Sequence, residues 1–285
     1  MVYMWPMIID FHTHVFPPEI IADKETFLRR DPWLRELYGN PKAKMASVDD
    51  LLASMEEEGI AVSVICSFGW RDTGLIEMCN SYLIQVMRDH PGRIVGLAAV
   101  QPLAGRQSIR ELERCAQAGM PGFGELMPHG QGFRLSDSRL LAPLVEAARA
   151  LGMFALTHAS EPVGHLYQGK GDVTPAELHS FIQAFPDLRV VAAHFGGGYP
   201  IYELMPEVHA SAANLWYDSA AALYLYRPEI FPLTAGIAGI QKILWGSDFP
   251  LISQRRMLDY AKESGLEPEE LALALGGNAA AFLRI

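Results

Sequence analysis

The sequence predicts an α/β fold, a single (β/α)8 TIM barrel, on three observations. Short, almost continuously apolar segments alternate with longer amphipathic ones, as parallel strands covered by helices do. The 285 residues suit one barrel, which typically uses about 250. No Gly-x-Gly-x-x-Gly motif follows the first apolar segment, which weakens the alternative of a doubly wound dinucleotide-binding sheet. We therefore expect residues 1–285 to form one barrel domain.

The eight predicted strands share a short, β-branched or apolar composition. They are Met7–Phe11, Ala61–Cys66, Ile94–Val100, Gly122–Leu126, Met153–Thr157, Arg189–Ala193, Leu215–Asp218 and Lys242–Gly246. The sequence contains one long insertion after the first strand, at residues 15–46, and it is rich in proline and charge. Because barrel active sites lie at the carboxyl ends of the strands, we expect this loop to form part of a lid.

Helix signals separate the strands. Ser47 followed by Asp50 predicts the start of a helix that ends at Gly59. Thr174-Pro175 predicts another start, with proline at the first helical position. The remaining predicted helices are Gly74–Arg88, Ser108–Ala118, Ser138–Leu151, Tyr199–Ala213, Pro228–Ala238, Gln254–Ser264 and Pro268–Leu283.

Composition narrows the function classes. The formal net charge of −10 disfavours nucleic acid and anionic membranes as partners. No stretch reaches the roughly 18 apolar residues of a membrane span, and Met1–Asp10 resembles a strand rather than a signal peptide. The cysteines Cys66, Cys79 and Cys115 form no CxxC pair, so neither a disulfide framework nor a thiolate zinc site is indicated. We expect a cytoplasmic protein.

Two histidines end the first predicted strand. In Asp10-Phe11-His12-Thr13-His14, residues two apart point to the same side of the strand, so His12 and His14 project together. Two imidazoles aimed at one point suit a divalent metal such as zinc. An isolated His-x-His pattern equally fits two packed histidines.

The ends of three other strands strengthen the metal interpretation. His158, His194 and Asp248 follow the apolar segments of strands five, six and eight. Because parallel strands of a barrel end at one rim, these side chains converge with His12 and His14. Buried polar groups need partners, and a shared metal ion supplies one for all five.

These motifs together resemble the amidohydrolase superfamily. The resemblance rests on His12-Thr13-His14, His158, His194 and Gly246-Ser247-Asp248-Phe249-Pro250. The segment Gly277–Leu283 is similar to the amidohydrolase-2 branch, which includes the aminocarboxymuconate semialdehyde decarboxylase group. The resemblance extends from residue 8 to residue 283, and the ordered set is more specific than any one motif.

The resemblance implies a role for each of these residues. His12, His14 and His158 would be metal ligands. Asp248 would be a ligand that also accepts a proton from the water bound there. His194 would bind a second metal in a two-metal member, or polarise water or substrate in a one-metal member. Zinc is favoured over manganese as the divalent metal.

The fourth strand departs from the family pattern. Two-metal members usually carry a carbamylated lysine there, whereas this chain has Glu125 within Gly122–Leu126. Glu125 would either replace that lysine as a metal ligand or bind substrate beside a single metal. A rim carboxylate paired with an arginine remains a third interpretation. We favour one metal ion, with two as the alternative.

Residues after strand five are further candidates. His158-Ala159-Ser160-Glu161 is similar to the His-x-x-Glu of deaminases in this superfamily, which makes Glu161 a candidate proton shuttle. The polar, glycine-rich loop that follows supplies His165, Tyr167 and Lys170 as candidate substrate contacts. A solvated surface loop explains the same residues without function.

Three more candidates follow strands two and four. Trp70 and Arg71 follow strand two, and His129 follows strand four. Basic groups at one rim suit a substrate that carries a carboxylate. Surface positions are the alternative for each.

Two reactions need the same ligand set. In hydrolysis, water activated by the metal attacks a lactone, amide or ester carbonyl; in non-oxidative decarboxylation, an aromatic or enoic acid loses carbon dioxide. Glu125 and Glu161 favour hydrolysis, because extra carboxylates serve proton shuttling. Deamination ranks third, and a non-catalytic barrel would have no need of Asp248. The expected partner is a small molecule, and family analogy allows a homo-oligomer.

Overall fold

The computed structural model describes residues 7–285 and contains eight parallel strands in the predicted order. Residues 1–6, which begin the apolar N-terminal segment, lie outside the described residues. Each predicted strand overlaps an observed one. The bounds are β1 (Ile8–Thr13), β2 (Ile60–Ile65), β3 (Ile94–Gly96), β4 (Gly122–Leu126), β5 (Phe154–Thr157), β6 (Val190–Ala192), β7 (Leu215–Asp218) and β8 (Ile243–Leu244).

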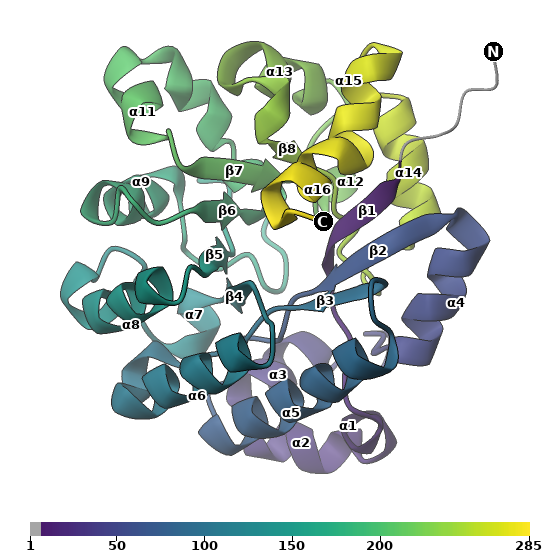
Figure 1. The fold of residues 1–285 in the computed structure, drawn as a ribbon, viewed down its shortest axis with the longest axis vertical. Coiled ribbons are helices and arrows are strands. Elements are labelled where there is room, and N and C mark those ends of the chain that lie inside the picture. The colour runs from purple at the N-terminus through teal and green to yellow at the C-terminus, as the bar shows by residue number, and fades with distance from the viewer. Residues whose placement is uncertain (1–6) are drawn as a thin grey trace.

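The strands form two sheets, β1–β2–β3 and β4–β5–β6–β7–β8, which meet at two seams. At one seam, the Phe11 amide donates to the Trp245 carbonyl at 2.8 Å. At the other, the Ala98 amide donates to the Gly122 carbonyl at 3.0 Å, and the Ala98 carbonyl accepts from the Gly124 amide at 2.9 Å. These bonds close the sheets into the predicted barrel, whose strands end at one rim (Figure 1).

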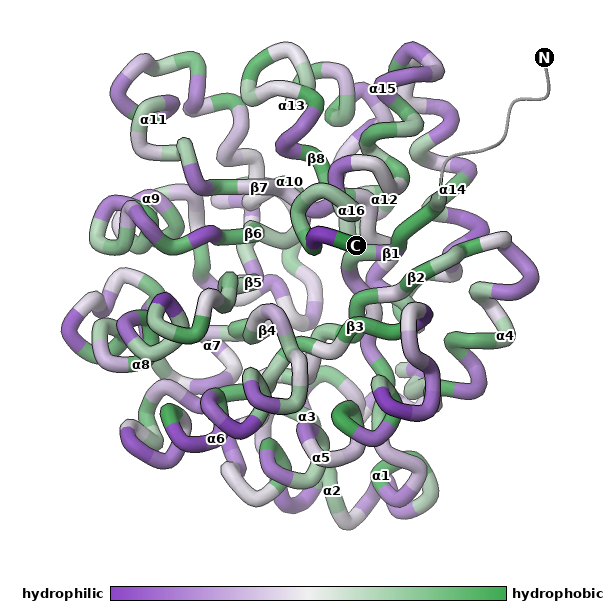
Figure 2. Tube along the Cα trace, in the orientation of Figure 1, coloured by the Kyte–Doolittle hydropathy of each residue, from purple (hydrophilic) through white to green (hydrophobic). Residues whose placement is uncertain are grey.

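Helices surround the strands, with apolar sides turned inward (Figures 1 and 2). Their bounds are α1 (Pro18–Ala22), α2 (Lys24–Arg30), α3 (Pro32–Tyr38), α4 (Val48–Glu58), α5 (Thr73–Asp89), α6 (Arg106–Gln117), α7 (Pro128–Gln131), α8 (Ser138–Ala150), α9 (Pro175–Ala184), α10 (Ala193–Gly196), α11 (Pro206–Ser211), α12 (Ala222–Leu225), α13 (Ile230–Ala238), α14 (Gln254–Lys262), α15 (Pro268–Ala272) and α16 (Asn278–Leu283). Ser47 and Asp50 form the predicted capping box, and Gly59 ends α4 in the left-handed conformation. Among residues 7–285, no helix combines the length and hydropathy that crossing a membrane requires.

Two predicted helices are interrupted. The predicted helix Tyr199–Ala213 divides into the 3-10 turn η2 (Tyr199–Leu204) and α11, because Pro206 restricts the residue before it to extended backbone. The predicted helix Pro268–Leu283 divides into α15, the π-helical turn η4 (Leu273–Gly277) and α16.

The C-terminal helix closes the amino-terminal end of the barrel. Phe282 of α16 packs edge-on against Phe11 and Phe154 inside the ring, with ring centroids 5.6 and 4.8 Å apart. Phe154 is the first residue of β5, and Arg189, directly before β6, lies over the Phe282 ring. The opposite, carboxyl-terminal rim is the open end, and the polar strand-end residues lie there.

The insertion at residues 15–46 is mostly helical, not the long loop that its proline and charge content predicted. It forms α1, α2 and α3, which lie together at the lower edge of Figure 1. Pro18 and Pro32 occupy first-turn positions that need no amide donor, and Asp31 caps α3 by accepting from two backbone amides. Phe16, Trp33 and their neighbours bury a separate apolar cluster against the loop after β2.

Candidate metal centre

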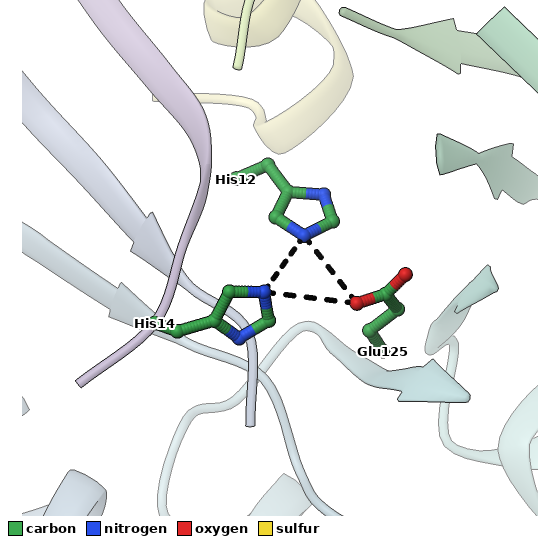
Figure 3. A group of neighbouring side chains, drawn as sticks. All are labelled: His12, His14 and Glu125. Atoms are coloured by element: carbon green, nitrogen blue, oxygen red, sulfur yellow. Dashed lines mark hydrogen bonds and ion pairs between the residues drawn. The ribbon is translucent and has the colours of Figure 1, made fainter. Parts of the chain in front are cut away.

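His12, His14 and Glu125 meet at the carboxyl-terminal rim. The Nε2 atoms of His12 and His14 lie 3.0 Å apart, and Glu125 Oε2 lies 3.5 and 3.7 Å from them (Figure 3). All three residues are buried. The pleat of β1 aims both imidazoles at one point, as the His-x-His spacing predicted, and β4, in the other sheet, supplies the carboxylate.

The other oxygen of Glu125 meets a second pair of imidazoles. Glu125 Oε1 lies 3.0 Å from His158 Nδ1 and 3.6 Å from His194 Nε2, and these two nitrogens are 3.1 Å apart. Glu125 therefore lies between two groups of nitrogen ligands. The rim-carboxylate alternative is excluded, because the side chain of Glu125 points inward among histidines.

Asp248 completes the ring of ligands from the end of β8. Its Oδ1 lies 3.3 Å from His14 Nε2 and 3.9 Å from His12 Nε2. The Asp248 side chain is 11% exposed, against 1% for Glu125. Of the two carboxylates, Asp248 is therefore the one that a ligand in the open rim can reach.

The outward nitrogens of the four histidines all face acceptors that carry no proton. His12 Nδ1 lies 2.8 Å from the Asp218 carboxylate, and His194 Nδ1 lies 2.7 Å from the Ala220 carbonyl. Cys66 and Lys170 supply the carbonyls for His14 and His158, each at 3.1 Å. When the inward nitrogens bind a metal ion, each outward nitrogen would carry the ring proton and donate it to its acceptor.

The inward nitrogens lie in pairs 3.0–3.1 Å apart. Two unprotonated nitrogens at this distance repel each other unless a proton or a metal cation lies between them. The separations of 3.0–3.9 Å among the inner nitrogens and oxygens are close to the tetrahedron edge of about 3.3 Å expected for zinc–nitrogen bonds near 2.1 Å. The donor set of imidazoles and carboxylates thus fits a divalent transition metal.

The ionisation of the cluster places two buried carboxylates among imidazoles. Burial alone raises the pKa of Glu125, but the surrounding imidazoles, His12 foremost, outweigh it and hold this pKa well below its usual value. Burial likewise opposes ionisation of Asp248, and its hydrogen bond with His14 and the positive charge of His12 lower that pKa. Burial lowers the pKa of His194, yet Glu125 and nearby carboxylates raise it to about 9. Two buried anions therefore demand protons or a metal between them.

Left-handed backbone places several of these residues. His194 (φ 58°, ψ 45°), Ala221 (φ 54°) and Asp248 (φ 65°) lie directly after β6, β7 and β8. Non-glycine residues in this region cost about 1 kcal/mol or more each and cluster at functional sites. Turning the chain at these points brings the side chains of His194 and Asp248 inward.

Asp218, at the end of β7, was not among the predicted site residues. Its carboxylate is fully buried and accepts from the His12 ring, from the His194 amide at 3.1 Å and from the Ala220 amide at 3.0 Å. A polar residue at the end of an apolar strand was the available signal, the same one that identified His158 and Asp248. Asp218 orients ligands on two strands without facing the centre itself.

Tyr38, at the end of α3, was also missed. Its ring packs against Phe16 at 5.1 Å and Phe68 at 5.9 Å. Burial, with the charges of Asp248 and Glu125, raises its pKa above the usual range. The insertion therefore brings a phenol to the edge of the metal centre.

Polar side chains of the loop after β5 form hydrogen bonds and an ion pair with one another. Glu161 pairs with Lys170 at 3.3 Å and accepts from the Tyr167 hydroxyl at 3.3 Å. His165 is exposed and packs on Tyr167, with centroids 5.4 Å apart. Gly171 lies beside His158, which places the end of this loop at the centre.

The other predicted substrate contacts pack against the insertion or against the segment after β4. Trp70 is fully buried in the apolar cluster beneath the insertion, stacked on Phe68 at 4.7 Å, so the structure places it in the core instead of at the rim. Arg71 is exposed, and its guanidinium donates to the Gly130 carbonyl. His129 is exposed too and packs against Trp33 at 5.8 Å.

Known proteins match this chain along nearly its whole length. A 2-amino-3-carboxymuconate-6-semialdehyde decarboxylase from Dictyostelium discoideum is 24% identical, over 96% of this chain and 91% of the relative.

Solved structures share the fold. A 5-carboxyvanillate decarboxylase from Novosphingobium aromaticivorans, complexed with manganese and 4-hydroxy-3-methoxy-5-nitrobenzoic acid, has a TM-score of 0.81 at 16% identity, covering 98% of this chain and 96% of that one. A 2,6-dihydroxybenzoate decarboxylase from Rhizobium has a TM-score of 0.74 at 15% identity, covering 98% and 99%.

The family model for amidohydrolases matches residues 9–285. This range includes every strand-end residue from His12 to Asp248 and the C-terminal segment that plugs the barrel. Both the motifs and the fold agree with that match. The chain therefore belongs to the amidohydrolase family of enzymes.

Proposed function

We propose that this protein catalyses metal-dependent, non-oxidative decarboxylation of a small aromatic or enoic carboxylic acid. The relatives described above are decarboxylases, and they favour this alternative over the hydrolysis that the sequence favoured. The sequence favoured hydrolysis because of two carboxylates, Glu125 and Glu161. The observation that carries the proposal is that both of them are bound to other side chains.

Glu125 and Glu161 both form hydrogen bonds or ion pairs with neighbouring side chains. Glu125 is buried between imidazoles of His12, His158 and His194. Glu161 is held by Lys170 and Tyr167 within its own loop. Both side chains therefore have structural partners that account for their presence, which removes the sequence-based reason for preferring hydrolysis, or deamination through Glu161.

The centre has what decarboxylation requires. A divalent cation, when bound, supplies a Lewis acid beside the substrate carboxylate. The imidazoles and Glu125 are held by hydrogen bonds, and the insertion packs Tyr38 against Phe16 and Phe68 in the segments that follow β1 and β2. Asp248, the carboxylate that a ligand in the rim can reach, is the group positioned to hold and move a proton.

The reaction balances with these groups. The bond between the substrate carbon and its carboxylate breaks, and carbon dioxide leaves without the electron pair. The pair stays on the aromatic or vinylic carbon, which takes a proton that Asp248 relays from water. No oxidant or reductant is needed.

The identity of the metal and the number of ions are part of the proposal. Manganese is present in the carboxyvanillate decarboxylase complex, whereas four imidazoles also suit zinc. The position of Glu125 between two nitrogen pairs accommodates one ion or two. We propose one ion, held by His12, His14, His158 and Asp248, with Glu125 between the two nitrogen pairs as a further ligand.

In a direct test, the purified protein is loaded with manganese or zinc and incubated with a panel of hydroxybenzoates and enoic acids. Carbon dioxide release and the decarboxylated product are expected for at least one acid. A panel of lactones, amides and esters tests hydrolysis in parallel. Turnover of that panel alone would overturn the decarboxylase proposal.

Replacing Asp248 gives a mutational prediction. Asp248→Asn keeps the size of the side chain but removes the carboxylate, so turnover should fall by at least about 100-fold, the lower range for a general acid–base group. Circular dichroism should remain that of the wild type. Wild-type kcat in this variant would contradict the assigned proton transfer.

A further inference from the structure

The segment 160–173 forms a closed loop over one side of the metal centre. Its ends are joined, because the Ser160 amide donates to the Val173 carbonyl at 2.7 Å. The tip is exposed: Val163 is 75% and Leu166 91% accessible. A compact loop with adjoining ends and an exposed tip needs internal bonds to hold one shape.

Lys170 supplies those bonds. Its ammonium donates to the Val163 carbonyl at 3.0 Å and the His165 carbonyl at 3.1 Å, and pairs with Glu161 at 3.3 Å. An ammonium group has three protons to donate, and here each has an acceptor within the loop. Lys170 is therefore not available as the direct substrate contact that the sequence predicted.

The backbone of the same residue reaches the metal centre. The Lys170 carbonyl accepts from His158 Nε2 at 3.1 Å and also from the Ser160 hydroxyl. With its Nε2 proton engaged, His158 presents Nδ1 to Glu125 and His194. Of the four histidines at the centre, His158 is the one that presents Nδ1 inward. Its orientation therefore depends on this carbonyl.

We propose that Lys170 is a positioning residue: its side chain fixes the loop so that its carbonyl holds the metal ligand His158. Loss of the three ammonium bonds would let the carbonyl move away from Nε2. His158 could then rotate or donate from the other nitrogen. The inference rests on the metal-binding part of the proposed function and is independent of the reaction catalysed.

The loop also contacts the insertion. The Gln168 side chain donates to the Glu36 carbonyl, and Gly169 lies against Leu37. The loop that Lys170 holds therefore connects the insertion to a ligand of the metal centre.

The test compares Lys170→Met, which keeps the length of the side chain without its donors, with wild type and with Lys44→Met. Lys44 lies on the exposed surface of the insertion and serves as the matched control. Zinc affinity, measured by chelator competition without substrate, should fall about tenfold in Lys170→Met, as for other residues that orient metal ligands. Lys44→Met should match wild type.

A second readout separates positioning from general destabilisation. In the zinc-loaded protein, nitrogen-15 NMR should show a His158 Nε2–H proton that exchanges slowly with water in wild type and faster in Lys170→Met. Glu161→Gln, which removes the charge of the one carboxylate among the three acceptors of the Lys170 ammonium, should show a smaller change, and it provides the test if Lys170→Met does not fold.

Unchanged affinity and exchange in both variants would overturn the inference. These measurements need no turnover, so failure of the decarboxylase proposal leaves them unaffected. A lower melting temperature with wild-type affinity would show that Lys170 stabilises the loop only, and this outcome also contradicts the inference.

Discussion

Asp218 shows how one buried carboxylate serves two ligands at once. It accepts from the His12 ring at 2.8 Å and from the His194 backbone amide at 3.1 Å. The first bond fixes the His12 tautomer with Nε2 facing the metal, and the second holds the left-handed turn that aims His194. Without Asp218, two ligands on β1 and β6 lose their orientation together.

Asp218→Asn tests this coupling. The amide keeps the volume, but it offers one acceptor oxygen where the carboxylate offers two, so either His12 or the His194 turn loses its bond. We expect metal affinity to fall by about 10- to 100-fold, measured by chelator competition. Asp187→Asn, at a side chain 69% exposed and paired with Arg149, is the matched control. Equal affinities in the two variants would show that Asp218 is not needed for orientation.

The sequence could predict the residues that face the centre but not those that hold them. Polar side chains at the ends of apolar strands are recognisable in the sequence, and the structure brings these residues together. They are His12, His14, His158, His194 and Asp248. The outward partners of His14 and His158 are backbone carbonyls of Cys66 and Lys170. Every residue has a carbonyl, so residue type carries no signal for such a contact.

At the scale of elements, the insertion is the largest departure from the prediction. Its prolines suggested a loop, but they stand at helix starts, where proline is well suited. Its apolar residues Phe16 and Trp33 find partners in Phe68 and Trp70, far along the chain. Helices this short are stable only through such tertiary contacts, which a local pattern does not reveal.

Gly130→Ala tests how the insertion is docked. A methyl group at Gly130 would overlap the Trp33 indole, so α3 must shift. We expect faster limited proteolysis within residues 15–46 and a raised KM, because Tyr38 moves with α3. Gly236→Ala, in α13 with open space around it, should instead stabilise the protein by about 0.5–1 kcal/mol. Wild-type proteolysis and KM in Gly130→Ala would mean that α3 does not depend on this contact.

At the scale of the whole molecule, the candidate metal centre lies between the two sheets of the barrel. His12 and His14 belong to the three-stranded sheet, whereas Glu125 and the strands that carry His158 and His194 belong to the five-stranded one. The described strands of the two sheets meet at only two short seams. A cation held by ligands from both sheets therefore acts as a further link between them.

Metal removal should consequently lower the stability of the whole barrel. A ligand at 100 times its Kd stabilises the folded state by about 2.7 kcal/mol, which corresponds to a melting temperature about 5–10 °C higher for a protein of this size. Calorimetry of the chelator-treated protein, before and after adding zinc or manganese, measures the shift. Calcium at equal ionic strength is the control, because it prefers all-oxygen ligands over imidazoles. Equal shifts with calcium and zinc would indicate a salt effect, whereas a zinc-specific shift that His14→Gln abolishes would locate the link at this rim.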